Sequence, residues 1–259
     1  MLVKPAYFAL FKLTLRQLFW SRRGLLILIG SLLPLVIALI FRFKVNSTTG
    51  VNSFIPHITF FLYGFLTSLC AVFYGSAIVS DEIDGRGLTY LQMRPLKKQQ
   101  ILLTKFAAYL VGCTIFIIVS HLLLTGIIQT HPKLKDRGLV LAVSFLYTGS
   151  LSLGLLAYGA FAMLLSVRFK HPVLWGLLFV FGWEKITSIP PMPSGIKRIS
   201  LSHYLMTLFP DFKLRGDILD DFLGNTPPAV WIAALVICLL TAGAMWLAVR
   251  IFKEREYLV

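Results

Sequence analysis

The chain has 259 residues, of which 57% are hydrophobic and only 14% are charged, and its formal net charge is +14. Soluble domains carry roughly 25% charged residues, so this composition excludes an ordinary soluble domain. It predicts an all-α integral membrane protein built as a single domain over residues 1–259. The basic residues flank the apolar runs, which favours contact with membrane lipids over binding of nucleic acid.

Residues 1–24 form an amphipathic leader. Aromatic and leucine side chains from Tyr7 to Phe19 share one face of a helix, while Lys12 and Arg16 lie elsewhere on it. This pattern predicts a helix that lies in the membrane interface. The alternative is that the segment only leads into the first span.

Six apolar runs predict six transmembrane helices, at about residues 25–41, 58–79, 106–128, 139–167, 173–189 and 229–249. Small residues between Gly149 and Ala162 predict close helix packing in the fourth span. Prolines interrupt the outer segment 187–228, where we expect two short amphipathic helices, at about 196–209 and 212–223. Counting Lys and Arg favours cytoplasmic termini, because this orientation places 15 of them inside and 10 outside.

A polar loop, residues 80–105, separates the second and third spans. It opens with Asp81 and Glu82 and continues with five basic residues: Arg86, Arg94, Lys97, Lys98 and Lys105. Residues 88–93 can form a short helix that Pro95 would end. A charged helix held between two spans suits the docking of a soluble partner. A solvated loop that merely orients its neighbouring spans is the other interpretation.

Three ionisable residues fall within or at the edge of predicted spans. His121 lies near the middle of the third span, and Glu184 and Lys185 end the short fifth run. Ionisable groups in a membrane are candidates for a substrate path. The simpler alternatives are a neutral His121 bonded to a neighbouring helix, a Lys185 that reaches the interface, and a Glu184 that meets water.

The sequence lacks several motifs of enzymes. It has no GxxxxGK[ST] loop for nucleotides, no HExxH and no GxSxG. Cys70, Cys113 and Cys238 lie in apolar runs outside any CxxC or Cys/His pattern, so neither a disulfide framework nor a zinc site is expected. A membrane-embedded enzyme or processing factor using His121 and Glu184, or a non-transport scaffold, remains open as an alternative function.

The layout of spans around the polar loop resembles the permease subunit of type-2 ABC exporters. The local resemblance lies in the loop, where the chain has Asp81-Glu82, Gly87-Leu88-Thr89-Tyr90-Leu91, Arg94-Pro95, Ile101-Leu102-Leu103 and Lys105. The family's Gly-Thr pair is not present as such, and Gly85-Arg86-Gly87 stands in its place, so the resemblance aligns the docking residues to within about a residue.

The resemblance implies a transport subunit of the cell membrane rather than an enzyme. Two permease chains, identical or different, would pair, and each would dock a separate ATPase subunit that carries ATP and Mg²⁺, with no cofactor in this chain. The loop would be the coupling helix, with docking residues Asp81, Glu82, Arg86, Gly87, Leu91, Arg94 and Pro95. Export is the implied direction, and the substrate stays open.

Overall fold

The structure is a computed structural model that describes residues 3–44, 54–55, 58–84, 97–134, 137–188, 194–209 and 228–254. Every regular element within these ranges is helical. The all-α prediction is therefore confirmed for the described part of the chain. The docking segment 85–96 and the predicted helix 212–223 lie outside the described residues.

Within the described residues, five helices are long and apolar enough to cross a bilayer. They are contained in α2 (Arg22–Lys44), α4 (Gly64–Asp84), α6 (Lys98–Gln129), α7 (Arg137–Arg168) and α13 (Val230–Glu254). These helices correspond to the first, second, third, fourth and sixth predicted spans. Several extend past their predicted ends, since the polar residues at the borders of the apolar runs continue the helical hydrogen bonding.

The fifth predicted span is shorter and irregular. It consists of α8 (Pro172–Leu177), the π-helical segment η2 (Leu178–Glu184) and α9 (Lys185–Ser188). At 1.5 Å per residue this stretch advances only about 25 Å, against a hydrocarbon core of about 30 Å. A sixth crossing therefore stays a prediction. A second π-helical segment, η1 (Thr59–Tyr63), leads into α4.

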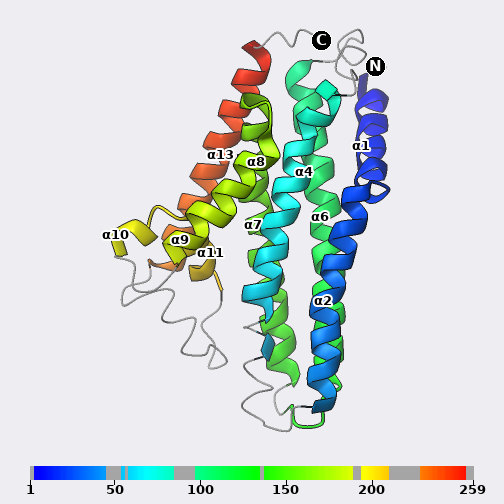
Figure 1. The fold of residues 1–259 in the computed structure, drawn as a ribbon, viewed down its shortest axis with the longest axis vertical. Helices are drawn as coiled ribbons and strands as arrows, with labels where there is room; N and C mark the ends of the chain where they lie inside the picture. The colour runs from blue at the N-terminus through cyan, green and yellow to red at the C-terminus, as the bar shows by residue number, and fades with distance from the viewer. Residues whose placement is uncertain are drawn as a thin grey trace.

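The leader is a separate helix, α1 (Val3–Phe19), which confirms the helical part of the prediction. The chain turns at Trp20–Ser21, and the Ser21 hydroxyl accepts a bond from the Gly24 backbone N–H at 3.0 Å. In Figure 1, α1 and α2 follow one another along the side of α6. The placement of α1 in the membrane interface remains a prediction.

The centre of the bundle is α7, which packs against α4, α6 and α13. In Figure 1 the start of α1, the end of α4, the start of α6 and the end of α13 lie at the same end of the bundle. The other end contains the end of α2 and the end of α6. The residues at the edges of the 80–105 loop therefore share one end of the molecule with the described chain ends.

In its described part, residues 194–209, the outer segment forms two very short helices, α10 (Ser194–Lys197) and α11 (Leu201–Thr207), near the start of α13 (Figure 1). One predicted helix over 196–209 is therefore wrong. The helical path breaks around Ser200, because a buried carboxylate binds the backbone N–H groups that open α11.

Candidate functional site

A buried ion pair joins the two ends of the 80–105 loop. Glu82 lies in the last turn of α4 and Lys105 in the second turn of α6, and the Lys105 Nζ donates to Glu82 Oε1. The Lys105 side chain is 6% exposed and that of Glu82 is 16% exposed. The pair therefore holds the two helices from which the loop departs at a fixed separation.

The α1 helix covers this ion pair from one side. A pocket of 270 Å³ lies between α1, α4 and α6, and residues of all three line it, including Gln17, Asp81, Glu82 and Lys105. The pocket gives the ion pair a polar neighbourhood beneath the leader helix. Sequence reasoning placed α1 and the loop in the same compartment but did not predict this contact.

Tyr7 attaches α1 to the C-terminal end of the 80–105 loop, where α6 begins. Its hydroxyl donates to Gln100 Oε1 and accepts the Lys97 backbone N–H at 3.3 Å. On α4, the Tyr74 hydroxyl donates to the Leu18 carbonyl at 3.2 Å. These bonds connect α1 to both helices that flank the loop.

The predicted docking residues fall into two groups. Asp81 is exposed in the last turn of α4, and Glu82 is partly buried beside Lys105. Arg86, Gly87, Leu91, Arg94 and Pro95 lie outside the described residues. The contact with Lys105 gives Glu82 a role within this chain, and docking of a partner remains a prediction for all seven residues.

His121 is fully buried at the meeting point of η1, α6 and α7. Its Nε2 bonds Thr59 Oγ1 at 2.9 Å, and its Nδ1 lies 3.0 Å from Thr148 Oγ1 and 3.2 Å from Ser144 Oγ. The Tyr63 ring meets the imidazole edge to face, with 5.0 Å between centroids. Three helices thus share one polar hub, which is the simpler of the two interpretations of His121.

Glu184 anchors the outer helices. Its carboxylate accepts hydrogen bonds from the Leu201 and Ser202 backbone N–H groups, both at 2.9 Å, and from the Ser200 hydroxyl at 2.7 Å. The Tyr158 hydroxyl of α7 donates to it at 3.4 Å. A carboxylate at a helix N-terminus binds otherwise unpaired backbone donors. Glu184 therefore joins η2, α7 and α11.

The structure does not bring the predicted substrate-path residues together. In the described part of the chain, His121 and Glu184 have no bonding partner in common: on α7, His121 contacts Thr148 and Glu184 contacts Tyr158. Lys185 is exposed beside the buried Glu184. Among the described residues no group of three or more His, Cys, Asp and Glu could hold a metal. Whether His121, Glu184 and Lys185 line a substrate path stays a prediction.

Sequence reasoning missed several polar partners. Tyr7, Tyr158 and Ser200 read as ordinary members of amphipathic or apolar stretches, and only the folded arrangement shows their bonds.

His203 of α11 is also buried, and neither ring nitrogen has a hydrogen-bond partner among the described residues. Burial, and then the positive charges of Lys197 and Arg198, lower the pKa of His203, so this ring is neutral at pH 7.

Comparison with known proteins identifies a family. The family model described as "ABC-2 family transporter protein" matches residues 20–182, which is well over half of the chain. The match begins at the end of α1 and ends within η2, so it includes both ends of the 80–105 loop. No curated protein matches the sequence.

Proposed function

Because the chain belongs to the ABC-2 family of transporter proteins, and is thus a membrane permease subunit rather than an enzyme, we propose that it works as one half of an ATP-driven exporter. In this proposal two permease chains pair in the membrane. Two separate ATPase subunits, which supply the ATP and Mg²⁺, dock on the 80–105 loops.

The observation that carries the proposal is the Glu82–Lys105 ion pair. The 80–105 loop can transmit force to the bundle only when it is attached rigidly. The ion pair supplies that attachment, because it joins the two helices that carry the loop. Through α6 the attachment continues to α7, the central helix, and through Tyr7 and Tyr74 it continues to α1. Closure of the ATPase pair would then tilt several helices together, which is the rigid-body motion that alternating access requires.

The permease pair needs an unoccupied apolar surface. The small residues of α7, such as Gly154, Gly159 and Ala160, are buried inside the chain against its own helices, so they do not supply this surface. The α2 helix, on its side toward α4, and the α8–η2 stretch instead expose large apolar side chains, including Leu33, Leu174 and Leu178. We assign the second permease chain to these two elements, the first and fifth of the predicted spans.

The alternative of a membrane-embedded enzyme has little support. An enzyme using both His121 and Glu184 would gather them at one place, whereas each is engaged in its own network. Their bonds with hydroxyls and backbone N–H groups explain why both are buried without invoking a reaction.

The test is affinity purification of the detergent-solubilised chain with identification of co-purifying proteins. The wild-type chain should retain an ATPase subunit in equal amount. The double variant Glu82→Gln/Arg94→Ala should lose it, because the charged docking edge and its attachment are both removed. Lys133→Ala is the matched control, since it removes one positive charge at the opposite end of the bundle, and it should keep the ATPase.

Two results would contradict the proposal. One is a clean wild-type preparation that contains no ATPase at all. The other is a double variant that retains the ATPase and stimulates ATP hydrolysis as the wild-type chain does.

A further inference from the structure

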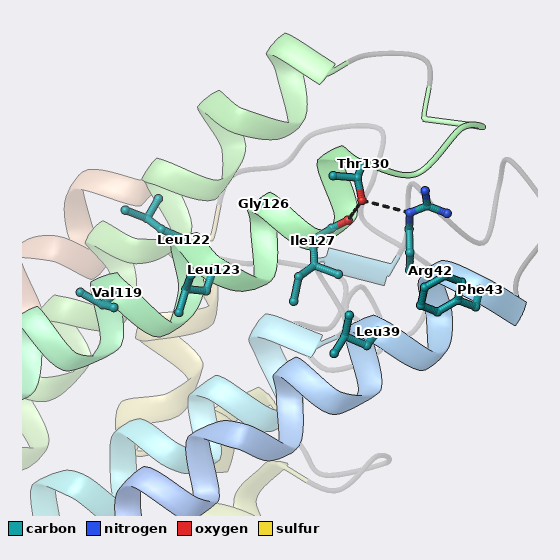
Figure 2. Close-up of a pocket in the computed structure, with 9 residues that line it drawn as sticks. All are labelled: Leu39, Arg42, Phe43, Val119, Leu122, Leu123, Gly126, Ile127 and Thr130. Carbon is teal, nitrogen blue, oxygen red and sulfur yellow. Dashed lines mark hydrogen bonds between the residues drawn. The ribbon is translucent and has the colours of Figure 1, made fainter.

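An open apolar groove runs between α2 and α6 at the end of the bundle opposite the 80–105 loop (Figure 2). Its volume of 670 Å³ falls within the range of about 300–1,000 Å³ that is typical of small-molecule sites. Its lining residues are Leu39, Arg42, Phe43, Val119, Leu122, Leu123, Gly126, Ile127 and Thr130. Among these lining residues Arg42 alone carries a charge.

Arg42 is held in a defined orientation at the mouth of the groove. Its Nε donates to Thr130 Oγ1 at 3.0 Å, and the Thr130 hydroxyl donates its own proton to the Ile127 carbonyl at 2.7 Å. Figure 2 shows both bonds, with the terminal guanidinium nitrogens directed away from Thr130. This leaves a fork of N–H donors, a geometry that matches the oxygens of a phosphate.

The length of the groove along α6 matches the thickness of the hydrocarbon layer in one leaflet of a bilayer. From Thr130 at the mouth to Val119 at the far end, α6 advances about 16 Å, and half of the hydrocarbon core is about 15 Å. Both walls belong to membrane-spanning helices. Leu123 and Val119 are more than half exposed, so lipid chains reach the open side of the groove.

We propose that this groove binds one glycerophospholipid, whose phosphate contacts Arg42 and whose acyl chain lies along Gly126 and Leu123 toward Val119. The charge at the mouth matches the anionic headgroup, and the apolar walls match the chain. Thr130 is a positioning residue: its hydroxyl accepts the Arg42 Nε–H and so orients the guanidinium, while its own proton is donated to the Ile127 carbonyl. The site differs from the ATPase-docking loop in both chemistry and place.

Gly126 offers a direct way to fill the groove. A Cβ at this position would meet no atom within 4 Å, so Gly126→Leu adds a side chain to the groove without a backbone clash. Gly243 of α13 is equally open and exposed. Gly243→Leu is therefore a matched control that adds the same side chain elsewhere on the membrane surface.

The experiment titrates the full-length detergent-solubilised chain with phosphatidylglycerol and measures bound lipid by native mass spectrometry. Gly126→Leu should abolish the specific binding, and Gly243→Leu should leave it unchanged. Arg42→Gln should weaken it about fivefold, the typical effect of one basic charge near a lipid surface. Arg42→Lys keeps the charge and should lose less than Arg42→Gln. Thermal unfolding of each variant shows that it is folded.

Further arms identify the source of the phosphate. Diacylglycerol, which lacks a phosphate, should bind at least fivefold more weakly, and inorganic phosphate should not displace the lipid. The proposal is overturned if Gly126→Leu and Arg42→Gln bind phosphatidylglycerol as tightly as Gly243→Leu does. It is likewise overturned if diacylglycerol binds as well as phosphatidylglycerol, or if inorganic phosphate alone competes with the lipid. It is also overturned if Gly126→Leu separates two permease copies while lipid binding is unchanged. None of these readouts requires the ATPase, so they are independent of the proposed function.

Discussion

Lys105 is a charged side chain in a buried place, and Glu82 neutralises it there. Removing one member of a buried ion pair leaves the other without its partner, and this typically costs about 3–5 kcal/mol. The same chain offers an exposed pair for comparison, since Arg250 and Glu254 of α13 are spaced i, i+4 with side chains that are 60% and 64% exposed.

We predict that Glu82→Gln destabilises the protein by about 3 kcal/mol, because it leaves the buried Lys105 ammonium without its ion-pair partner. Glu254→Gln should cost only about 0.3–0.5 kcal/mol, since water replaces the partner of an exposed pair. Thermal unfolding in detergent measures both changes.

The double variant Glu82→Gln/Lys105→Met removes both charges of the ion pair. It should be more stable than Glu82→Gln alone, because the unpaired charge is gone. Equal losses of stability in Glu82→Gln and Glu254→Gln would contradict the structural role of the buried pair.

Among the helices, α7 depends on glycine for its close contacts. A Cβ at Gly159 would lie 2.4 Å from the Tyr109 ring of α6, and a Cβ at Gly75 of α4 would lie 2.9 Å from the Ala162 Cβ. Tyr109 is buried, and its hydroxyl donates to the Leu155 carbonyl at 2.9 Å, so its ring has little freedom to move. The sequence prediction of tight packing by small residues in this span is confirmed at Gly154, Gly159 and Ala162, whereas Gly149 is exposed.

We predict that Gly159→Ala destabilises the protein by about 1–3 kcal/mol, the typical cost of overpacking a core. Gly149→Ala on the same helix should be neutral or stabilising by up to about 1 kcal/mol, because its Cβ would meet nothing within 4 Å and alanine favours the helix. Unfolding temperatures of the two variants test this difference. A Gly159→Ala protein as stable as Gly149→Ala would show that α6 and α7 are not in close contact.

The whole molecule has two distinct ends. The edges of the 80–105 loop lie with the start of α1 and the end of α13, whereas Arg42 and Thr130 lie at the opposite end (Figure 1 and Figure 2). The excess of basic residues predicts that the loop end is cytoplasmic.

Labelling of single cysteines tests this orientation. Cys70 and Cys113 are buried, and Cys238 is exposed, so the Cys238→Ser chain serves as the background. Lys97→Cys at the loop end should react with a membrane-impermeant maleimide only in inverted vesicles. Lys133→Cys at the opposite end should react only from the outside of intact cells. The reverse pattern would invert the topology and rule out docking of a cytoplasmic ATPase on the loop.

The membrane class, the all-α fold and the approximate places of five long helices could all be predicted from the sequence. These follow from composition and apolar run length, which are local properties. The sequence also identified the 80–105 loop and a family resemblance that the family match bears out. The docking residues from Arg86 to Pro95 remain predictions.

The partners of the buried polar groups could not be predicted from the sequence and follow from the tertiary structure. In the folded protein Lys105 pairs with Glu82, and His121 bonds residues of neighbouring helices. Glu184 accepts the Leu201 backbone N–H, so α11 begins there and the longer predicted helix does not form. The fold also places Arg42 beside Thr130 at the mouth of a groove, although 88 positions separate them. The physical reason is that a buried polar group is stabilised by whichever donor or acceptor the packing brings near, and residue type and spacing along the chain do not specify that partner.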